Sequence, residues 1–248
     1  MRDWNEGVGE NEGEYTLTVS WSALRDAAAA YFERICGLSE DNPKAGIIRR
    51  GSYALLEEIA PSIDIRARIR ALGRECVGSE FLEVSGIRFP CCMLREPELP
   101  AVTELYAVVI TAGDIAVPDG SMTAALYGDL WGTAYVNAAS DFVRDALEGG
   151  RGVCLREGAG PGWYDMSAAL LPDFFRIVDG GKIGVAVTGN MMEPVKSVAC
   201  FYLGFEREPR ADVFERRCQY CLSESRGCDF CKLRLTPICN QGPKVKRF

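Results

Sequence analysis

Two neighbouring segments constrain the fold of this chain more than any other feature. The segment from Leu105 to Thr111 is almost entirely apolar, which is typical of a central strand buried on both faces. The segment from Ser121 to Leu147 contains many alanines and few helix breakers, so it predicts one long helix that ends at Gly149 and Gly150. A chain that combines such a strand with such a helix is expected to be a mixed α/β (α+β) protein.

The rest of the chain divides into shorter elements by the same criteria. Ser20 is a suitable helix N-cap, because its hydroxyl can accept a hydrogen bond from a free amide of the first turn. Apolar and charged residues alternate around Arg66 and Arg68, which predicts a half-buried strand with a charged outer face. The predicted strands are Tyr15–Val19, Ile63–Ile69, Phe81–Phe89 with Gly86 as a kink or turn, Gly152–Leu155, Ile183–Val187 and Val198–Phe205. The other predicted helices are Ser20–Cys36, Gly51–Ile59 and Met166–Val178.

Composition limits the kinds of partner that this chain can have. Hydrophobic residues make up 48% of the sequence, and the formal net charge of -7 disfavours general binding to nucleic acid. The first residues, MRDWNEGVGENEGEYT, contain no apolar run of the kind found in signal peptides. The longest apolar stretch, Ala107 to Val117, is interrupted by polar residues and is too short to cross a bilayer. We therefore expect a cytoplasmic protein that binds neither membrane nor nucleic acid.

The length and the changes in composition suggest one domain with an appendage. A chain of 248 residues is long enough for one large domain. Residues 1–13 are polar, acidic and rich in glycine, so we expect a flexible lead-in there. Charge rises and cysteines become frequent at about Pro209. The expected organisation is a lead-in at 1–13, an α/β domain at 14–209 and a cysteine-rich extension at 210–248.

The sequence contains 11 cysteines and no histidine. An odd number of cysteines cannot pair completely within one chain, and a cytoplasmic location disfavours disulfides. The absence of histidine excludes a Ser-His-Asp triad, a Cys-His pair and zinc bound through imidazole. A tightly held metal would therefore have to be bound by thiolates or carboxylates.

The cysteines of the C-terminal extension have the spacing of a metal site. They form a C-x2-C-x6-C-x2-C pattern followed by one more cysteine, and the residues are Cys218, Cys221, Cys228, Cys231 and Cys239. Each C-x2-C turn can direct two thiolates at one metal centre. The link of six residues is shorter than in most zinc ribbons, so an iron–sulfur cluster, of the 4Fe-4S type, is favoured over zinc. A reduced tail without metal is the third interpretation.

A glycine-rich loop lies between a predicted strand and a predicted helix. Its sequence is GAGPGW, and it includes Gly160, Pro161, Gly162 and Trp163. Glycines allow backbone amides to approach a ligand closely, and a helix that begins nearby would present free amides to an anionic or zwitterionic group. An ordinary glycine turn beside a tryptophan of the core explains the same residues equally well.

The segment NMMEPVKS (residues 190–197), which we call the Met-Met-Pro segment, joins the last two predicted strands. Its adjacent residues Met191 and Met192 have flexible, polarisable side chains that adapt to irregular surfaces. They predict either an adaptable contact surface or a buried corner of the domain.

In their order along the chain, these segments resemble a known family. The order is PGW, then IGVAVTGNMMEPVKSVACFYLG, then the C-x2-C tail, and DLWGTAYVNAASDF lies in the long helix. The sequence resembles the activation domain of cobalamin-dependent methionine synthase, and more closely the free-standing activation-domain proteins of anaerobic bacteria. The resemblance is strongest over Gly160 to Gly204 and weaker over about Tyr106 to Gly150.

The resemblance implies the fold, the ligand and the partner of the family. The synthase domain binds S-adenosylmethionine and faces the corrinoid of a partner domain. When the cobalt falls to the inactive Co(II) state, one electron and a methyl group from S-adenosylmethionine restore it. The methyl donor is bound by an arginine ahead of Pro-Gly-Tyr, by the backbone of that loop and by a carboxylate of a helix.

This chain matches the family's ligand contacts only in part. Pro161 and Gly162 match, Trp163 replaces the tyrosine, and Asp129 matches the acidic helix position. The position of the arginine is taken by Gly158; Arg156 lies two residues further upstream and would bind the ligand in its place only if the loop bulges. Thr133 stands where a second carboxylate is expected. Losing charge-assisted hydrogen bonds weakens recognition of an amino-acid group, so we expect S-adenosylmethionine to bind weakly or not at all.

Two functions are compatible with these patterns. The first is an accessory protein for reductive activation of a corrinoid protein or cobalamin-dependent methyltransferase, with the cysteine cluster relaying an electron from a flavodoxin or ferredoxin. The second is a module without enzymatic activity, in which a zinc-thiolate tail mediates assembly with a corrinoid methyltransferase system. In both, the partner holds the corrinoid. We expect Trp163 of the glycine loop and the adjacent Met191 and Met192 to form the face that contacts the corrinoid of the partner.

Overall fold

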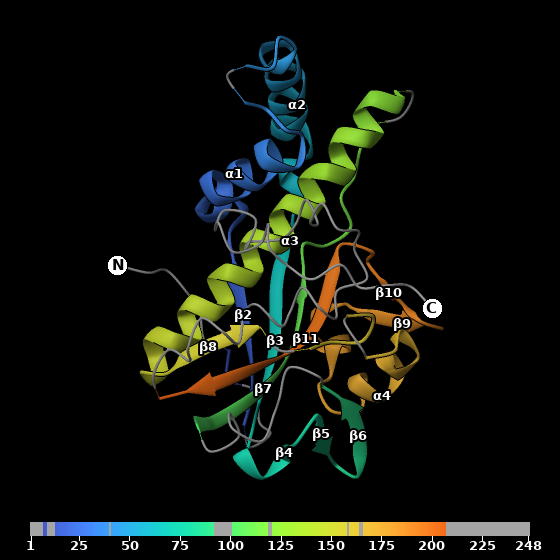
Figure 1. The fold of residues 1–248 in the computed structure, drawn as a ribbon. Coiled ribbons are helices and arrows are strands. Elements are labelled where there is room, and N and C mark those ends of the chain that lie inside the picture. The colour runs from blue at the N-terminus through green and yellow to red at the C-terminus, as the bar shows by residue number, and fades with distance from the viewer. Residues whose placement is uncertain are drawn as a thin grey trace, which may run out of the picture.

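A mixed sheet-and-helix domain forms the body of the chain in the computed structural model, which describes residues 7–8, 13–39, 41–91, 101–118, 121–157, 159–163 and 166–206. Within these residues, six strands form one sheet in the order β1-β2-β3-β7-β11-β8, and all neighbouring pairs are antiparallel. The strands are β1 (Gly7–Val8), β2 (Glu14–Val19), β3 (Ile65–Leu72), β7 (Val102–Thr111), β8 (Cys154–Glu157) and β11 (Ser197–Phe205). The prediction of a central strand at Leu105–Thr111 is confirmed, because β7 lies between β3 and β11 (Figure 1).

Three helices form one side of the domain. They are α1 (Arg25–Ile35), α2 (Ala45–Ile59) and α3 (Met122–Arg151), and α3 runs diagonally across the molecule in Figure 1. Helix α3 crosses a face of this sheet, and α1 and α2 pack against α3. The core on this side includes a stacked pair, Phe32 and Trp131, whose ring centroids are 4.2 Å apart. The indole nitrogen of Trp131 donates a hydrogen bond of 2.9 Å to the carbonyl oxygen of Ser52 in α2. Trp131 therefore links α3 to α1 through Phe32 and to α2 through Ser52. We call this side of the sheet the α3 face.

Smaller elements cover the opposite face. They are β4 (Val77–Gly78), β5 (Phe81–Val84), β6 (Ile87–Pro90), α4 (Leu171–Phe175), and the hairpin of β9 (Ala186–Thr188) and β10 (Met191–Glu193). Phe89, Phe174 and Phe201 pack edge to face in the core on this side. Residues of β11 alternate between the two cores, so Cys200 and Tyr202 lie on the α3 face, whereas the odd-numbered residues lie on this side. Short 3-10 turns are Trp21–Leu24, Ala60–Ser62, Arg74–Cys76, Ala168–Leu170 and Gly180–Ile183.

Several predicted boundaries differ from the structure. The long helix does not end at Gly149 and Gly150; it ends at Arg151, and Gly152 provides the left-handed cap with φ +69°. Glycine is only mildly unfavourable inside a helix, so tertiary packing can extend the helix past two of them. The hydroxyl of Ser20 accepts a hydrogen bond from the amide of Ala23, as the capping argument predicts, although the element it caps is the 3-10 turn Trp21–Leu24 that precedes α1. The hydroxyl of Ser121 caps α3 in the same way.

Two elements near the C-terminal end of the body are shorter than expected, and one helix is longer. The helix predicted at Met166–Val178 is reduced to a 3-10 turn capped by Ser167 and the five-residue α4. Gly184, with φ +78°, ends a 3-10 turn in the middle of the predicted strand Ile183–Val187, so β9 begins only at Ala186. Helix α2 begins at Ala45, six residues before its predicted start. None of the helices in the described part of the chain has the length and apolar character that crossing a membrane requires.

Candidate functional site

The glycine loop lies along the edge of β11. Strand β8 pairs with β11 only from Tyr202 to Phe205, and the loop continues along the same edge, where the Phe201 amide donates to the Ala159 carbonyl at 2.9 Å. A Cβ atom on Gly160 would lie 2.3 Å from the carbonyl oxygen of Ala199. Gly160 is therefore required for close packing of the loop backbone against the strand.

Hydrogen bonds within the loop use several of its amides. The amide of Gly162 donates a hydrogen bond to the carbonyl oxygen of Met166 at 2.9 Å. The amide of Trp163 donates to the carbonyl oxygen of Gly160 at 2.8 Å, and the amide of Met166 donates to the carbonyl oxygen of Trp163 at 3.0 Å. Gly162 adopts φ +90°, a conformation that side chains disfavour. A ligand could recruit these three amides only by displacing bonds that already exist. Trp163 is half-buried and packs against the core on the α3 face.

Asp129, the acidic helix position, forms an ion pair with a lysine of the Met-Met-Pro segment. The ammonium of Lys196 lies 2.6 Å from the Asp129 carboxylate and donates to the Thr133 hydroxyl at 3.1 Å. The side chain of Asp129 is 62% exposed and that of Lys196 is 20% exposed. The structure thus joins α3 to the segment after β10, and the carboxylate that the resemblance assigns to a ligand already has a cation beside it.

A strap of chain without helix or strand, residues 112–118, packs against α3 beside this ion pair. A Cβ on Gly128 would lie 2.3 Å from Val117, and a Cβ on Gly132 would lie 2.8 Å from both Ile115 and Lys196. The amide of Ala112 also donates to the carbonyl of Lys196 at 2.9 Å. Sequence reasoning missed this arrangement, although two glycines four residues apart on one helix indicate a face that accepts close packing.

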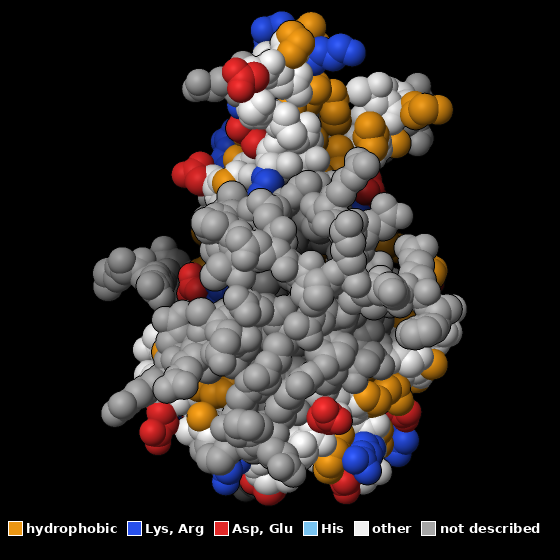
Figure 2. Space-filling model, viewed as in Figure 1, with side chains coloured by type: hydrophobic (Ala, Val, Ile, Leu, Met, Phe, Trp, Pro, Cys, Tyr) orange, Lys and Arg blue, Asp and Glu red, His pale blue; other side chains and the backbone are white. Residues whose placement is uncertain are grey.

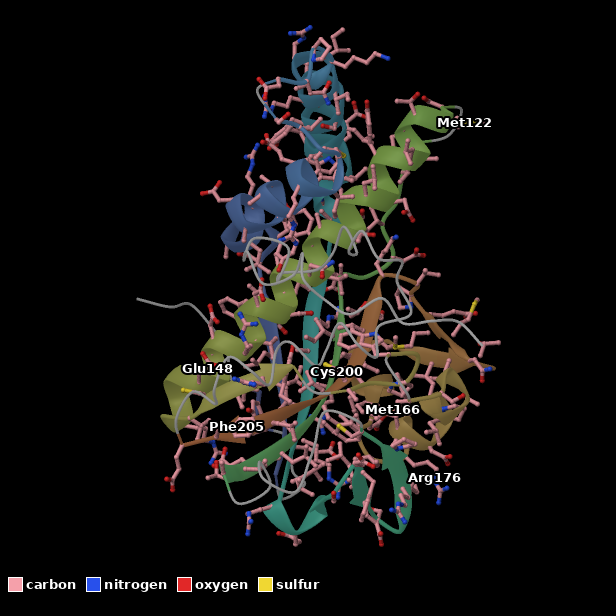
Figure 3. The ribbon with its side chains drawn as sticks, in the orientation of Figure 1. Met122, Glu148, Met166, Arg176, Cys200 and Phe205 are labelled. Atoms are coloured by element: carbon pink, nitrogen blue, oxygen red, sulfur yellow. The ribbon has the colours of Figure 1, made fainter. Side chains whose placement is uncertain are left out.

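Arg156 lies on the other side of the sheet from Asp129. Its guanidinium carbon is 5.8 Å from the centroid of the Phe205 ring, in the core opposite the α3 face, and the residue is 6% exposed. Figure 3 labels Phe205 and Cys200 on β11, whose side chains belong to opposite cores. The structure therefore does not bring Arg156 and Asp129 together around one ligand.

The two methionines have different environments. Met192 is half-buried against the core opposite the α3 face, whereas Met191 is 62% exposed on β10. Because Trp163 packs on the α3 face, Trp163 and Met192 contact opposite cores. Only Met191 of the pair offers a large apolar surface to a partner.

The proposed metal ligands Cys218, Cys221, Cys228, Cys231 and Cys239 lie outside the described residues. Within the described ranges, no group of three or more cysteine or carboxylate side chains could hold a metal ion. Burial raises the pKa of the Cys36 and Cys76 thiols, which keeps both protonated at neutral pH. The proposed metal site therefore rests on the spacing of the five C-terminal cysteines in the sequence.

Comparisons with known proteins agree with the expected fold. Comparison with models of protein families finds no match for the sequence, and comparison with curated protein sequences finds none either. Among solved structures, a chain described as "Crystal Structure of the MetH Reactivation Domain bound to AdoHcy" is similar, with a TM-score of 0.55 and 10% identity. The similarity covers 86% of this chain and 88% of that chain. At this identity the comparison establishes the fold alone, and the mixed helix-and-sheet fold expected from the sequence is confirmed: the chain shares the fold of a MetH reactivation domain.

Proposed function

We propose that this protein supports the reductive activation of a corrinoid protein or a cobalamin-dependent methyltransferase. The observation that carries the proposal is the shared fold over 86% of this chain with the reactivation domain of MetH. The sequence segments that resemble the activation-domain family support it independently, because they include the glycine loop and the Met-Met-Pro segment that flank β11. The partner would hold the corrinoid, and this chain would bind it during reactivation.

The geometry around α3 supports weak binding of S-adenosylmethionine. The ammonium of such a ligand would have to displace Lys196 from Asp129, and the Thr133 hydroxyl is occupied by the same lysine. Arg156 lies in the opposite core and cannot replace the expected arginine without a large rearrangement. If each lost charge-assisted bond is worth about 1.5–3 kcal/mol, two of them lower affinity by roughly a hundredfold or more.

Calorimetric titration with S-adenosylmethionine tests this part of the proposal. We expect no saturable binding below about millimolar concentrations, since each 1.4 kcal/mol of lost binding energy is about a tenfold loss of affinity. A Lys196→Met variant should bind more tightly than the wild type if Asp129 contacts the ligand, because the competing ammonium is gone. Low-micromolar binding by the wild-type protein would contradict weak binding.

The electron relay is assigned to the C-terminal cysteines. Five cysteines in two C-x2-C pairs plus one are a suitable thiolate set for an iron–sulfur cluster, which would supply the single electron that Co(II) requires. A flavodoxin or ferredoxin is the proposed donor to the tail.

Anaerobic purification distinguishes an iron–sulfur tail from a zinc tail. An iron–sulfur protein should be brown with broad visible absorption, whereas a zinc-thiolate module would be colourless. Elemental analysis should find metal in the wild type and none in the double variant Cys218→Ser/Cys221→Ser. The control variant Cys36→Ser should retain the metal, because Cys36 lies at the C-terminal end of α1 and its thiol is protonated. Less than about half an equivalent of iron plus zinc in the wild type would exclude the metal site, since such thiolate sets bind metal tightly.

The relay itself needs a functional readout. Reduced protein should convert the Co(II) form of a partner to Co(I), followed by its visible spectrum, and the double cysteine variant should not. Conversion at the same rate by that variant would show that the tail does not carry the electron.

A further inference from the structure

The strap, residues 112–118, covers one side of the N-terminal half of α3. Figure 3 labels Met122 at the free end of this helix, past the main sheet, and Figure 2 shows that end at the surface with hydrophobic side chains around it. Two odd-numbered strap residues face the helix, because Val117 lies over Gly128 and Ile115 lies over Gly132. The even-numbered residues are exposed on the outer side of the strap, namely Asp114, Ala116 and Pro118.

The two ends of the strap are attached differently. At the start of the strap, the amide of Ala112 donates to the carbonyl oxygen of Lys196 at 2.9 Å, and the carbonyl oxygen of Ala112 accepts a hydrogen bond of 3.0 Å from the amide of Asp64. For the described residues 114–118, the hydrogen bond to the rest of the domain runs from the amide of Ala116 to the hydroxyl of Ser62 at 3.0 Å. The outer part of the strap is therefore held mainly by its side-chain packing on α3.

Lys196 contacts both the strap and Asp129. A Cβ on Gly132 would lie 2.8 Å from Cδ1 of Ile115 and 2.8 Å from Cγ of Lys196, so the two side chains share the space that the missing side chain of Gly132 leaves on α3. The ammonium of the same lysine lies 2.6 Å from the Asp129 carboxylate. The ion pair therefore keeps the stem of Lys196 beside Ile115.

This ion pair is exposed enough to open. The side chain of Asp129 is 62% exposed, and that of Lys196 is 20% exposed. Ion pairs that water reaches contribute little to stability, and salt screens them further. The contact is therefore suited to opening and closing rather than to holding α3 and the Met-Met-Pro segment permanently together.

We propose that Lys196 and the strap form a latch on α3, in which the ion pair between Lys196 and Asp129 favours the closed strap. When Asp129 loses this cation, the stem of Lys196 leaves the space beside Gly132, and residues 114–118 lift from α3 more often. The coupling is reciprocal, so a closed strap favours the ion pair and lowers the apparent affinity of any ligand cation for Asp129. The latch is a property of this chain alone and does not depend on the proposed corrinoid partner.

Hydrogen–deuterium exchange of the full-length chain, followed by mass spectrometry of strap peptides, tests the latch. Asp129→Asn should raise the exchange rate of the amides of residues 114–117 by about two- to fivefold, the size of effect expected from an exposed ion pair. Raising sodium chloride from about 0.05 M to about 1 M should raise strap exchange in the wild type and leave it unchanged in Asp129→Asn.

Two further variants calibrate the measurement. Glu57→Gln is the matched control, because it makes the same carboxylate-to-amide change in the exposed ion pair of Arg25 with Glu57, between α1 and α2, and it should leave strap exchange unchanged. Gly128→Ala should open the strap directly, since its Cβ would lie 2.3 Å from Val117, and it should raise strap exchange with the ion pair intact.

Three results would overturn the latch. Unchanged strap exchange in Asp129→Asn, beside a rise in Gly128→Ala, would show that the strap moves independently of the ion pair. A rise in Glu57→Gln as large as that in Asp129→Asn would mean that both variants loosen the helices in general. Unchanged exchange in Gly128→Ala would show that packing on α3 does not hold the strap.

Discussion

Substituting Gly160 by alanine tests whether close packing against β11 holds the glycine loop in place. The new Cβ would lie 2.3 Å from the Ala199 carbonyl oxygen, so reaching an ordinary contact of about 3.5 Å requires the loop to move by roughly 1 Å. That shift would break the 2.9 Å bond between the Phe201 amide and the Ala159 carbonyl. Overpacking costs about 1–3 kcal/mol and the lost hydrogen bond about 0.5–1.5 kcal/mol, so we expect a loss of about 2–4 kcal/mol in the free energy of unfolding.

Thermal and urea unfolding of the full chain measure this loss. For a domain of this size each kcal/mol lowers the melting temperature by about 2–4 °C, so Gly160→Ala should melt roughly 4–16 °C lower than the wild type. Gly150→Ala is the control: it makes the same substitution inside α3, where a Cβ would meet nothing within 4 Å. Alanine is the better helix former, so this variant should be as stable as the wild type or more stable by up to about 1 kcal/mol. An unchanged melting temperature in Gly160→Ala would refute the packing role of Gly160. A role of Gly160 in ligand binding would then be the remaining explanation for the glycine.

Three further substitutions test the helical side of the structure. Trp131→Phe removes the 2.9 Å hydrogen bond to Ser52 and part of the stacking surface on Phe32, and should cost about 2–4 kcal/mol in urea unfolding. Lys196→Met keeps an apolar stem against Gly132 but removes a partly exposed ion pair, so its free energy of unfolding should change by less than about 1 kcal/mol. A larger loss would mean that the ion pair holds the segment after β10 against α3. The Tyr135 hydroxyl is buried and has no hydrogen-bond partner among the described residues, so Tyr135→Phe should be neutral or stabilising by up to about 1 kcal/mol. Burial raises the pKa of Tyr135 to about 12, whereas the pKa of a tyrosine in the unfolded chain is about 10. The stability that the neutral hydroxyl contributes is therefore complete below a pH of about 10 and is lost as the pH rises to about 12. Alkaline unfolding, followed by circular dichroism, should lack this pH-dependent contribution in the Tyr135→Phe variant.

The elements that sequence patterns identified best are those with strong local signals. Leu105–Thr111 has a continuous apolar run, and β7 contains it entirely. Many alanines and few helix breakers follow Ser121, and α3 begins at Met122, one residue after the predicted start. The turn at Gly86 joins β5 and β6, because glycine adopts the positive φ of +76° without strain. Boundaries failed where tertiary packing opposed weak local preferences, as at Gly149 and Gly150.

The candidate site was less accessible to sequence reasoning. The sequence indicated that Asp129 and the Met-Met-Pro segment were of interest, but no local pattern indicated that Lys196 reaches Asp129 from 67 positions away in the chain. The glycines of the loop suggested an approach to a ligand, whereas Gly160 approaches the backbone of β11. Both features depend on which distant segments of the chain lie side by side in the fold. Local sequence patterns do not show these long-range neighbours.

The sequence by itself determined the class of fold, the long helix, the central strand and the absence of histidine chemistry, because each depends on residue types or on spacing along the chain. Only the tertiary structure decided which side of the sheet each side chain occupies. Alternation along a strand separates two sets of residues, but the pairing of β8 with β11 determines that Arg156 belongs with Phe205 and lies opposite α3. In the same way, the exposure of Met122 and Leu126 follows from where α3 extends past its neighbours, since a helix buries an apolar residue only where another element covers it.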